Sequence, residues 1–422
     1  MPIRPDGAER EGGCMKLYRL RLLPLAAALL LAACSGPDTP SESSGGPTAG
    51  GTAAASTAPT LPPTTPPTTP PTTLPTAYRD PETGVIYEGW ELTGERAEDF
   101  ELPLEGATGF ASIETAVYAS PEEDGSVVAL LSPGDAFTIR EERDARWWRI
   151  ERDGLEDGWV DNTCCYLNIP DVVPSIVIDN TNAYASAYVS SGKAIPGITG
   201  EVLYASLCWN ERFGGVRYVA AANYIMVKKI YAAQQAALAE GYTLVVNETF
   251  RPYDVQLNIA AELKKLYLAD PEVKAGIDRR PWSIGWFIAS RMSTHQIGCA
   301  MDVTLAKVRR VRYRLSGGYR YAEVAEYEAC VMPTPIHELS AAAVSLEKPV
   351  SSSSPTAWRE VEPAPTMTED ALRLKRYCTQ AGLSPLASEW WHFNDLEAKE
   401  AIGDGFTTEV FYLAASRSRI PE

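Results

Sequence analysis

The chain has 422 residues and a formal net charge of −17, from 38 basic and 55 acidic side chains. This excess of negative charge disfavours a nucleic-acid partner, because phosphate groups attract basic surfaces. The length is sufficient for two or three domains with substantial cores.

The N-terminus has the pattern of an export signal. A basic segment at residues 15–21 precedes an apolar run over residues 22–33, which is typical of a signal peptide and short for a membrane span. The run ends in "LAAC", which resembles the lipobox of bacterial lipoproteins, where the cysteine is acylated. We expect residues 1–33 to be removed and Cys34 to anchor the protein by lipid on the extracellular side of the bacterial membrane. An ordinary signal peptide with an incidental cysteine is the alternative.

Residues 34–76 are almost wholly Ser, Gly, Ala, Thr and Pro, and include "LPPTTPPTTPPTTLP". So few apolar side chains do not offset the entropy cost of ordering the backbone. The proline repeats favour the extended polyproline II conformation, at roughly 3.1 Å per residue. We expect a disordered, semi-rigid stalk here, followed by a short acidic spacer at residues 77–107.

Residues 108–170 have the pattern of a small all-β domain. Short β-rich runs such as "TAVYAS" and "RWWRIER" alternate with turn signals, including Pro133-Gly134 and Asp157-Gly158. The elements "SPGD", "RWWRIE" and "DGWV" resemble the bacterial SH3-like domain. The resemblance implies a small barrel that binds cell-wall peptide or glycan, and a packing or spacer domain without a ligand is the alternative.

Residues 171–422 show a mixed α and β pattern. Helices are predicted in the segment "AAANYIMVKKIYAAQQAALAEG" that ends at Gly241, in "VQLNIAAELKKLYLA", and in "TEDALRLKRYCTQAGL", where Thr368 is the expected N-cap. The segment "YTLVVNETF" is predicted to be a buried strand. The sequence between Lys307 and Pro365 is irregular, and a long insertion of this kind is expected to border or cover a functional site.

Three separate segments carry the side chains of a candidate catalytic site. "STHQIGCAMDVTL" supplies His295 and Asp302, "SEWWHF" supplies Glu389 and His392, and "ETFRPYDVQ" supplies Arg251. A catalytic zinc ion needs three nitrogen or oxygen ligands and an open position, a requirement that His295, Asp302 and His392 meet. Glu389 is the natural general base, and Arg251 is suited to polarising a carbonyl group or binding a carboxylate. Taken singly, each of these residues also fits a structural role.

Local geometry bears on this site in two places. Gly298 allows a tight turn that brings His295 back over the following strand. Because side chains alternate faces along a strand, Cys299 is expected to be a packed thiol and not a ligand. Residues three apart in a straight strand face opposite sides, so Glu389 and His392 require a bulge or turn between them.

The motifs "RPYDVQ", "STHQIGCAMDVTL", "MPTPIHELS" and "SEWWHF" resemble, in sequence and order, those of zinc D,D-peptidases of the vancomycin-resistance D-Ala-D-Ala dipeptidase type. The resemblance implies an α+β zinc peptidase domain over residues 171–422, with helices packed on a central, mainly antiparallel sheet and one Zn²⁺ ion. It makes the two histidines and Asp302 the zinc ligands, Glu389 the catalytic base and Arg251 the stabiliser of the transition state.

The same resemblance bears on substrate binding. Ser293 matches a family serine near the substrate carboxylate, and a local backbone hydrogen bond is its structural alternative. In "MPTPIHELS" the family has an acidic residue that helps to hold the free amino group of the substrate. Here His337 takes that place and Glu338 follows it. Either Glu338 assumes the role or the site admits a longer peptide, and an exposed loop position is the structural alternative for His337.

Six cysteines lie beyond the leader, and an exported location permits disulfides between them. Cys164 and Cys165 are not expected to pair with each other, because adjacent Cα atoms are about 3.8 Å apart, below the usual disulfide range. The sequence does not rank the pairings among the full set, which is Cys164, Cys165, Cys208, Cys299, Cys330 and Cys378.

These inferences predict an exported, lipid-anchored zinc metallopeptidase that hydrolyses the D-Ala-D-Ala dipeptide. A zinc D,D-carboxypeptidase that trims terminal D-Ala from peptidoglycan stem peptides is the first alternative, and a non-catalytic wall-binding protein is the second. The expected partners are these peptides, the cell wall through the SH3-like domain and the membrane through the lipid. Deletion of residues 109–168 should weaken wall association and spare hydrolysis of a soluble substrate.

Overall fold

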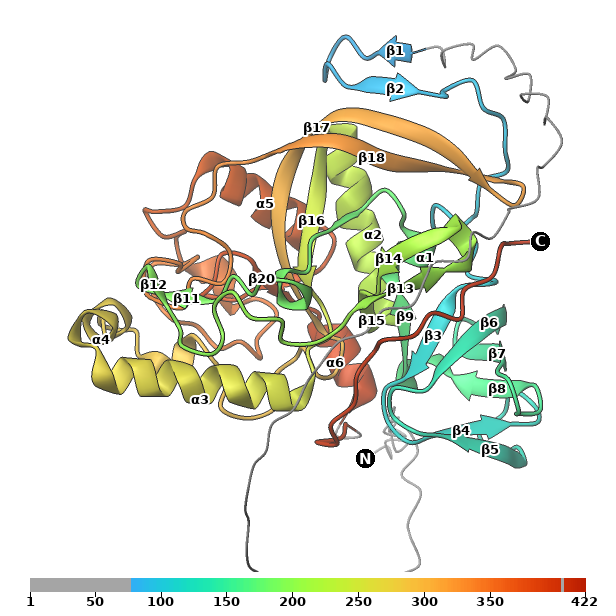
Figure 1. Ribbon diagram of the computed structural model, residues 1–422, viewed down its shortest axis with the longest axis horizontal. Helices are drawn as coiled ribbons and strands as arrows, with labels where there is room; N and C mark the ends of the chain where they lie inside the picture. The colour runs from blue at the N-terminus through green and yellow to red at the C-terminus, as the bar shows by residue number, and fades with distance from the viewer. Residues whose placement is uncertain (1–76, 404–405) are drawn as a thin grey trace, which may run out of the picture. The chain divides into compact units, whose positions relative to one another are not determined.

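The computed structural model describes residues 77–403 and 406–422. The predicted signal peptide, Cys34 and the predicted stalk lie outside these residues. Within the described ranges the chain forms two eight-stranded sheets, two short hairpins and six α-helices (Figure 1). None of the helices in these ranges is both long and apolar enough to span a membrane.

The first sheet, which we call the N-terminal sheet, is antiparallel throughout, with the order β15-β9-β3-β6-β7-β8-β4-β5. Its strands are β3 (Thr108–Ala111), β4 (Thr115–Tyr118), β5 (Val127–Leu131), β6 (Ala136–Arg143), β7 (Trp147–Glu151), β8 (Gly158–Asp161), β9 (Cys165–Asn168) and β15 (Ala221–Asn223). Phe137, Trp148 and Val160 are fully buried in its core. The predicted all-β segment is therefore present, and β15 extends its sheet from a later part of the chain.

The second sheet, the C-terminal sheet, has the order β1-β2-β17-β16-β10, with β18 and β20 also paired to β17 and β19 paired to β20. Its strands are β1 (Ala77–Arg79), β2 (Ile86–Glu88), β10 (Val177–Ile178), β16 (Tyr242–Glu248), β17 (Ala300–Ser316), β18 (Tyr319–Ala329), β19 (Ser384–Pro385) and β20 (His392–Asn394). Two pairings, β10 with β16 and β2 with β17, are parallel and the others are antiparallel. This agrees with the predicted central, mainly antiparallel sheet.

Helices cover this sheet, and two short hairpins lie outside both sheets. The helices are α1 (Ile169–Val172), α2 (Tyr224–Ala239), α3 (Tyr253–Ala269), α4 (Pro271–Ile277), α5 (Glu369–Gln380) and α6 (Leu396–Ile402); the hairpins are β11 (Val189–Ser190) with β12 (Lys193–Ala194), and β13 (Leu207–Asn210) with β14 (Gly215–Tyr218). α2 packs on β16, and α5 packs on α2 and β17 (Figure 1). Ile230 of α2, Leu374 of α5 and Val303 of β17 belong to one buried core.

The three predicted helices are present, with shifted ends. Thr368 caps α5 as predicted, since its side chain accepts a hydrogen bond from the Ala371 amide. α2 starts later than predicted, at Tyr224, because Asn223 is its N-cap and the residues before it form β15. Gly241, with a φ of +79°, ends the turn after α2 as expected of a glycine stop.

The predicted acidic spacer at residues 77–107 is part of the fold. Strand β2 pairs in parallel with β17, and Glu88 accepts a hydrogen bond from the Arg312 side chain at 3.0 Å. Val85 is buried against Val308 and Val311. Its few apolar residues therefore anchor this segment to the C-terminal sheet, and the acidic composition concealed that pairing.

The segment after Lys307 was predicted to be irregular, but its first part is regular β-structure. β17 and β18 form a long antiparallel hairpin, seen in orange in Figure 1, that turns at Gly317 and Gly318. Gly317 has a φ of +58°, as tight hairpin turns require. Cross-strand pairs such as Arg310 with Glu326, at 3.0 Å, hold the register. Charged side chains on the exposed face hid the strand pattern.

The two predicted domains share a core. The Trp148 ring of β7 packs edge-on against the Tyr224 ring of α2, with centroids 4.9 Å apart. The Tyr224 hydroxyl donates a hydrogen bond to Glu142 of β6 at 2.8 Å. Residues 77–422 belong to one compact unit. The two regions therefore depend on each other for burial, because each contributes apolar surface that the other covers.

Deletion of residues 109–168 is expected to destabilise the rest of the chain, contrary to the sequence-based expectation. The deletion removes the partner strand of β15 and exposes the buried face of α2 at Tyr224. We expect loss of the cooperative unfolding transition by calorimetry and association of the truncated protein in solution. A truncated protein that stays monomeric and melts at the temperature of the full chain would contradict the shared core.

Candidate metal centre

The C-terminal sheet places three polar residues side by side across adjacent strands. Asp302 of β17 lies directly opposite His392 of β20 on one side and opposite Glu248 of β16 on the other. Directly opposed residues in antiparallel strands have neighbouring side chains. All three are buried, with Asp302 only 1% exposed. Strand register thus joins residues that stand far apart in the sequence.

A tight turn brings the fourth residue to this point. Residues 293–298, which we call the cluster loop, precede β17 and carry His295. The Cys299 amide donates to the Thr294 carbonyl at 2.9 Å, and Gly298 has a φ of +65°. The predicted role of Gly298 in this turn is confirmed, and so is the packed position of the Cys299 thiol, which is fully buried.

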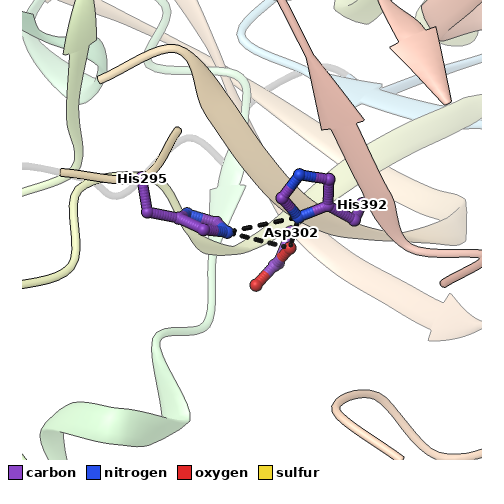
Figure 2. Close-up of side chains that lie close together, drawn as sticks. All are labelled: His295, Asp302 and His392. Atoms are coloured by element: carbon purple, nitrogen blue, oxygen red, sulfur yellow. Dashed lines mark hydrogen bonds and ion pairs between the residues drawn. The ribbon is translucent and has the colours of Figure 1, made fainter. Parts of the chain in front are cut away.

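Figure 2 shows His295, Asp302 and His392 pointing at one another. The Oδ1 atom of Asp302 lies 2.9 Å from Nδ1 of His392 and 3.4 Å from Nε2 of His295. The two ring nitrogens are 3.3 Å apart. Three potential ligand atoms therefore meet at one point, and we call these three residues the acceptor cluster.

In each histidine ring, the nitrogen that faces away from Asp302 makes a hydrogen bond that shows which ring nitrogen carries the lone pair. Nδ1 of His295 lies 2.7 Å from the Thr249 carbonyl oxygen, so it must donate its proton there. Nε2 of His392 lies 3.0 Å from Oδ1 of Asn394, which already accepts a hydrogen bond from the Thr294 hydroxyl. In the neutral rings the lone pairs of the inner nitrogens then face the Asp302 carboxylate. Only a proton or a cation between these atoms satisfies such an arrangement.

A divalent cation fits the acceptor cluster. For ligand bonds of about 2.0–2.1 Å in a tetrahedral site, ligand atoms lie about 3.3 Å apart, close to the 3.3 and 3.4 Å separations at His295. The outer hydrogen bonds to a carbonyl and an amide oxygen are those that hold metal-binding histidines in place. Burial lowers the pKa of His295 and keeps its lone pair free. The structure thus brings together the three predicted ligands in a metal-binding geometry.

Glu389 lies beside the acceptor cluster. A turn at Trp390 and Trp391 separates it from β20 and provides the change of direction that the sequence required. The Oε2 atom of Glu389 is 3.8 Å from Nδ1 of His392. Burial raises the pKa of Glu389 to about 8. A carboxyl group poised in this way exchanges a proton at neutral pH, and an adjacent cation would favour its ionised form.

Arg251 fixes the other side of Asp302. Its guanidinium donates to Oδ2 of Asp302 at 3.1 Å, to Glu248 at 2.6 Å and to Gln256 at 2.6 Å. Burial alone would lower the pKa of Arg251, but Glu248 outweighs it and raises that pKa. Glu248, Asp302 and His337 form a second group whose ligand atoms lie close enough to hold a metal ion. In that group the guanidinium of Arg251 already supplies a positive charge to both carboxylates.

Sequence reasoning missed Glu248. Its carboxylate accepts hydrogen bonds from Tyr204 at 2.6 Å, Asn182 at 2.7 Å and Tyr188 at 3.2 Å, besides the one from Arg251. The sequence signal was a charged residue at the end of a strand predicted to be buried, three positions before the arginine.

His337 and Glu338 lie elsewhere than the sequence predicted. His337 is fully buried behind Asp302, with its Nε2 atom 3.2 Å from Oδ2, and its ring stacks on Tyr188 with centroids 4.2 Å apart. It is therefore neither an exposed loop residue nor part of the cavity lining. Glu338 accepts hydrogen bonds from the amides of Ser191 and Gly192, which uses its carboxylate to hold the β11–β12 turn.

A cavity of about 320 Å³ opens onto the acceptor cluster. Its polar lining includes Arg251, Ser293, Glu389 and Lys399, and its apolar lining includes Trp286, Phe287, Leu386 and Trp391. Ser293 both lines the cavity and accepts a hydrogen bond from the His295 amide at 3.3 Å, so its two predicted positions are compatible. Leu339 and Ser352 also line it, which confirms that the irregular segment borders the site.

Comparison with known families identifies one part of the chain. Residues 114–164 match the bacterial SH3 domain. The match runs from the start of β4 to the short 3-10 helix after β8, so the predicted SH3-like domain is confirmed and the candidate metal centre lies outside it. No curated protein matches the chain.

The free thiol of Cys165 also confirms that it is not paired with its neighbour.

Zinc is expected to stabilise the protein through the acceptor cluster. At a free zinc concentration of 100 times Kd, binding to the folded state alone adds about 2.7 kcal/mol. His392→Ala should abolish this gain, because it leaves two ligands. Thermal unfolding with and without zinc, reversed by a chelator, measures the effect. An equal zinc-dependent rise of Tm in His392→Ala would contradict the assignment of the site.

Proposed function

We propose that this protein is a zinc-dependent peptidase that cleaves D-Ala-D-Ala termini. The observation that carries the proposal is the convergence of three acceptor atoms, with Glu389 alongside, at the wall of a cavity of about 320 Å³. Zinc and the D,D configuration of the substrate come from the four sequence motifs. The second class, a wall-binding protein without catalysis, does not explain why a protonatable carboxyl group adjoins the acceptor cluster.

The residues of the chain divide the chemistry among them. When bound, Zn²⁺ supplies Lewis-acid catalysis, which polarises a carbonyl group and makes water more acidic. The acceptor cluster would hold the ion. Glu389 would take the proton of the attacking water and return it to the leaving amine. Arg251 orients the Asp302 carboxylate by a hydrogen bond, and it also lines the cavity, where it would face the charge that develops on the scissile carbonyl.

Glu389→Gln is expected to lower kcat by about 10²–10⁴-fold, the contribution typical of a general base. Zinc affinity, measured by competition with a chromophoric chelator, should change little because Glu389 is not a ligand in this assignment. Glu400→Gln, an exposed change on α6, serves as the control and should keep full activity. Undiminished hydrolysis by Glu389→Gln would refute the base assignment.

The charges of the cavity favour a substrate with a free carboxylate. Lys399 of α6 lines the cavity, and among the described residues it has no ion-pair partner. The carboxylates in the lining are those of Asp302 and Glu389, which the proposed chemistry uses. A substrate carboxylate therefore has a charged partner in the lining, whereas a free ammonium group would find no carboxylate there beyond these two. This supports trimming of peptidoglycan stem peptides over hydrolysis of the free dipeptide.

Lys399→Ala is expected to raise KM for a peptide ending in D-Ala-D-Ala by about 10-fold or more, since a charged hydrogen bond contributes about 1.5–3 kcal/mol. Lys399→Arg should restore much of the loss. A peptide with an amidated C-terminus should bind the wild type and Lys399→Ala equally poorly. Equal KM values of wild type and Lys399→Ala for the free acid would contradict the role of Lys399.

The same assay separates the two substrates. An amino-blocked stem peptide should be cleaved with a higher kcat/KM than free D-Ala-D-Ala. The reverse order would favour the dipeptidase.

The proposed place of action is the outer face of the membrane, within reach of the wall. This proposal rests on the export signal and Cys34 in the sequence, and on the bacterial SH3 domain, which fits a wall-binding role.

A further inference from the structure

A tyrosine of the N-terminal sheet contacts the cluster loop. Tyr166 lies on β9, two residues beyond the segment that matches the bacterial SH3 domain, and is 1% exposed. Its hydroxyl donates a hydrogen bond to the carbonyl oxygen of Gln296 at 2.8 Å. Gln296 follows His295 directly, so this bond fixes the backbone next to a predicted metal ligand.

The loop is packed against the sheet as well as bonded to it. A Cβ atom on Gly298 would lie 2.7 Å from the Tyr166 ring and 2.9 Å from the Asn223 amide nitrogen. That amide donates to the Gly298 carbonyl at 2.8 Å, and Asn223 pairs opposite Tyr166 in the sheet. The edge of the N-terminal sheet therefore forms the surface on which the loop rests.

Gln296 connects the cluster loop to the backbone of Arg251. Its side-chain nitrogen donates to the Arg251 carbonyl at 3.0 Å, and its side-chain oxygen accepts from the Ser293 amide at 2.6 Å. A shift of Gln296 would thus move the chain segments of both His295 and Arg251.

Phe250 provides a second route to the same place. Its ring lies 5.7 Å from the Tyr166 ring and 5.0 Å from that of Phe411 in the C-terminal tail. Phe250 immediately precedes Arg251, and it shares a buried cluster with Phe110 of β3. Both segments that reach the acceptor cluster from this side therefore rest on the N-terminal sheet.

We infer that Tyr166 is a positioning residue of the metal site, so that the SH3-like domain is a structural part of the peptidase and not only a wall-binding module. This inference rests on the proposed function for its consequence in catalysis. The contacts on which it depends belong to the fold itself and involve no metal.

The test compares two buried tyrosines in the full chain. Tyr166→Phe removes the hydroxyl and keeps the ring. Tyr224→Phe is the matched control, because it removes an interdomain hydrogen bond of equal length, 2.8 Å to Glu142, that does not touch the cluster loop. Two quantities are measured for each: amide hydrogen exchange of residues 293–298 in the metal-free protein, and zinc affinity by competition titration.

In Tyr166→Phe we expect loop exchange to accelerate about 10-fold and zinc affinity to fall about 10-fold, as for a lost hydrogen bond in an outer shell. Tyr224→Phe should stay within about twofold of the wild type in both, even with a similar loss of Tm. Unchanged exchange and affinity in Tyr166→Phe would overturn the inference, as would equal effects of both variants. If the wild type bound no zinc while Tyr166→Phe still loosened the loop, the proposed function would fail and the positioning role would stand.

Discussion

The structure depends on how a single buried carboxylate is compensated. The Oδ1 atom of Asp302 faces two histidines, and its Oδ2 atom faces Arg251 and His337. Removing a carboxylate from water costs several kcal/mol unless it is paired and hydrogen-bonded. Three strands meet at this residue, and their register places a partner on each side. The strand register that forms the C-terminal sheet therefore also brings Asp302 and His392 of the acceptor cluster together.

The same compensation makes the acceptor cluster a candidate cation site. Glu248 and Asp302 bring two negative charges and Arg251 brings one positive charge, and because all three side chains are buried, water screens these charges only weakly. Burial would raise the pKa of Asp302, yet the neighbouring histidines hold it well below its usual range. Asp302 likewise raises the pKa of His392 against the effect of burial. Without a cation, a proton must occupy the point where the acceptors converge, and a bound metal ion would displace that proton.

The N-terminal sheet supports the cluster loop, which carries His295. β15, Asn223 and Tyr166 join the SH3-like domain to the turn that carries His295. The bulky rings of Trp148 and Tyr224 are buried where the two domains pack against each other. Small domains with exposed core faces are marginally stable alone. Because the SH3-like domain also completes the core of residues 171–422, the two cannot be treated as separate parts.

The sequence by itself determined residue types, turns and element types, because these follow from local patterns. It indicated the acceptor cluster, the turn at Gly298, the cap at Thr368 and the small all-β domain. The tertiary structure alone decided that Asp302 lies opposite His392, 90 positions away, and that Tyr166 supports Gln296 across 130 positions. It also decided that His337 is a buried partner of Asp302, and that an acidic stretch becomes β2. Strand register and burial are set by packing between distant segments, and no local pattern encodes which surfaces will meet.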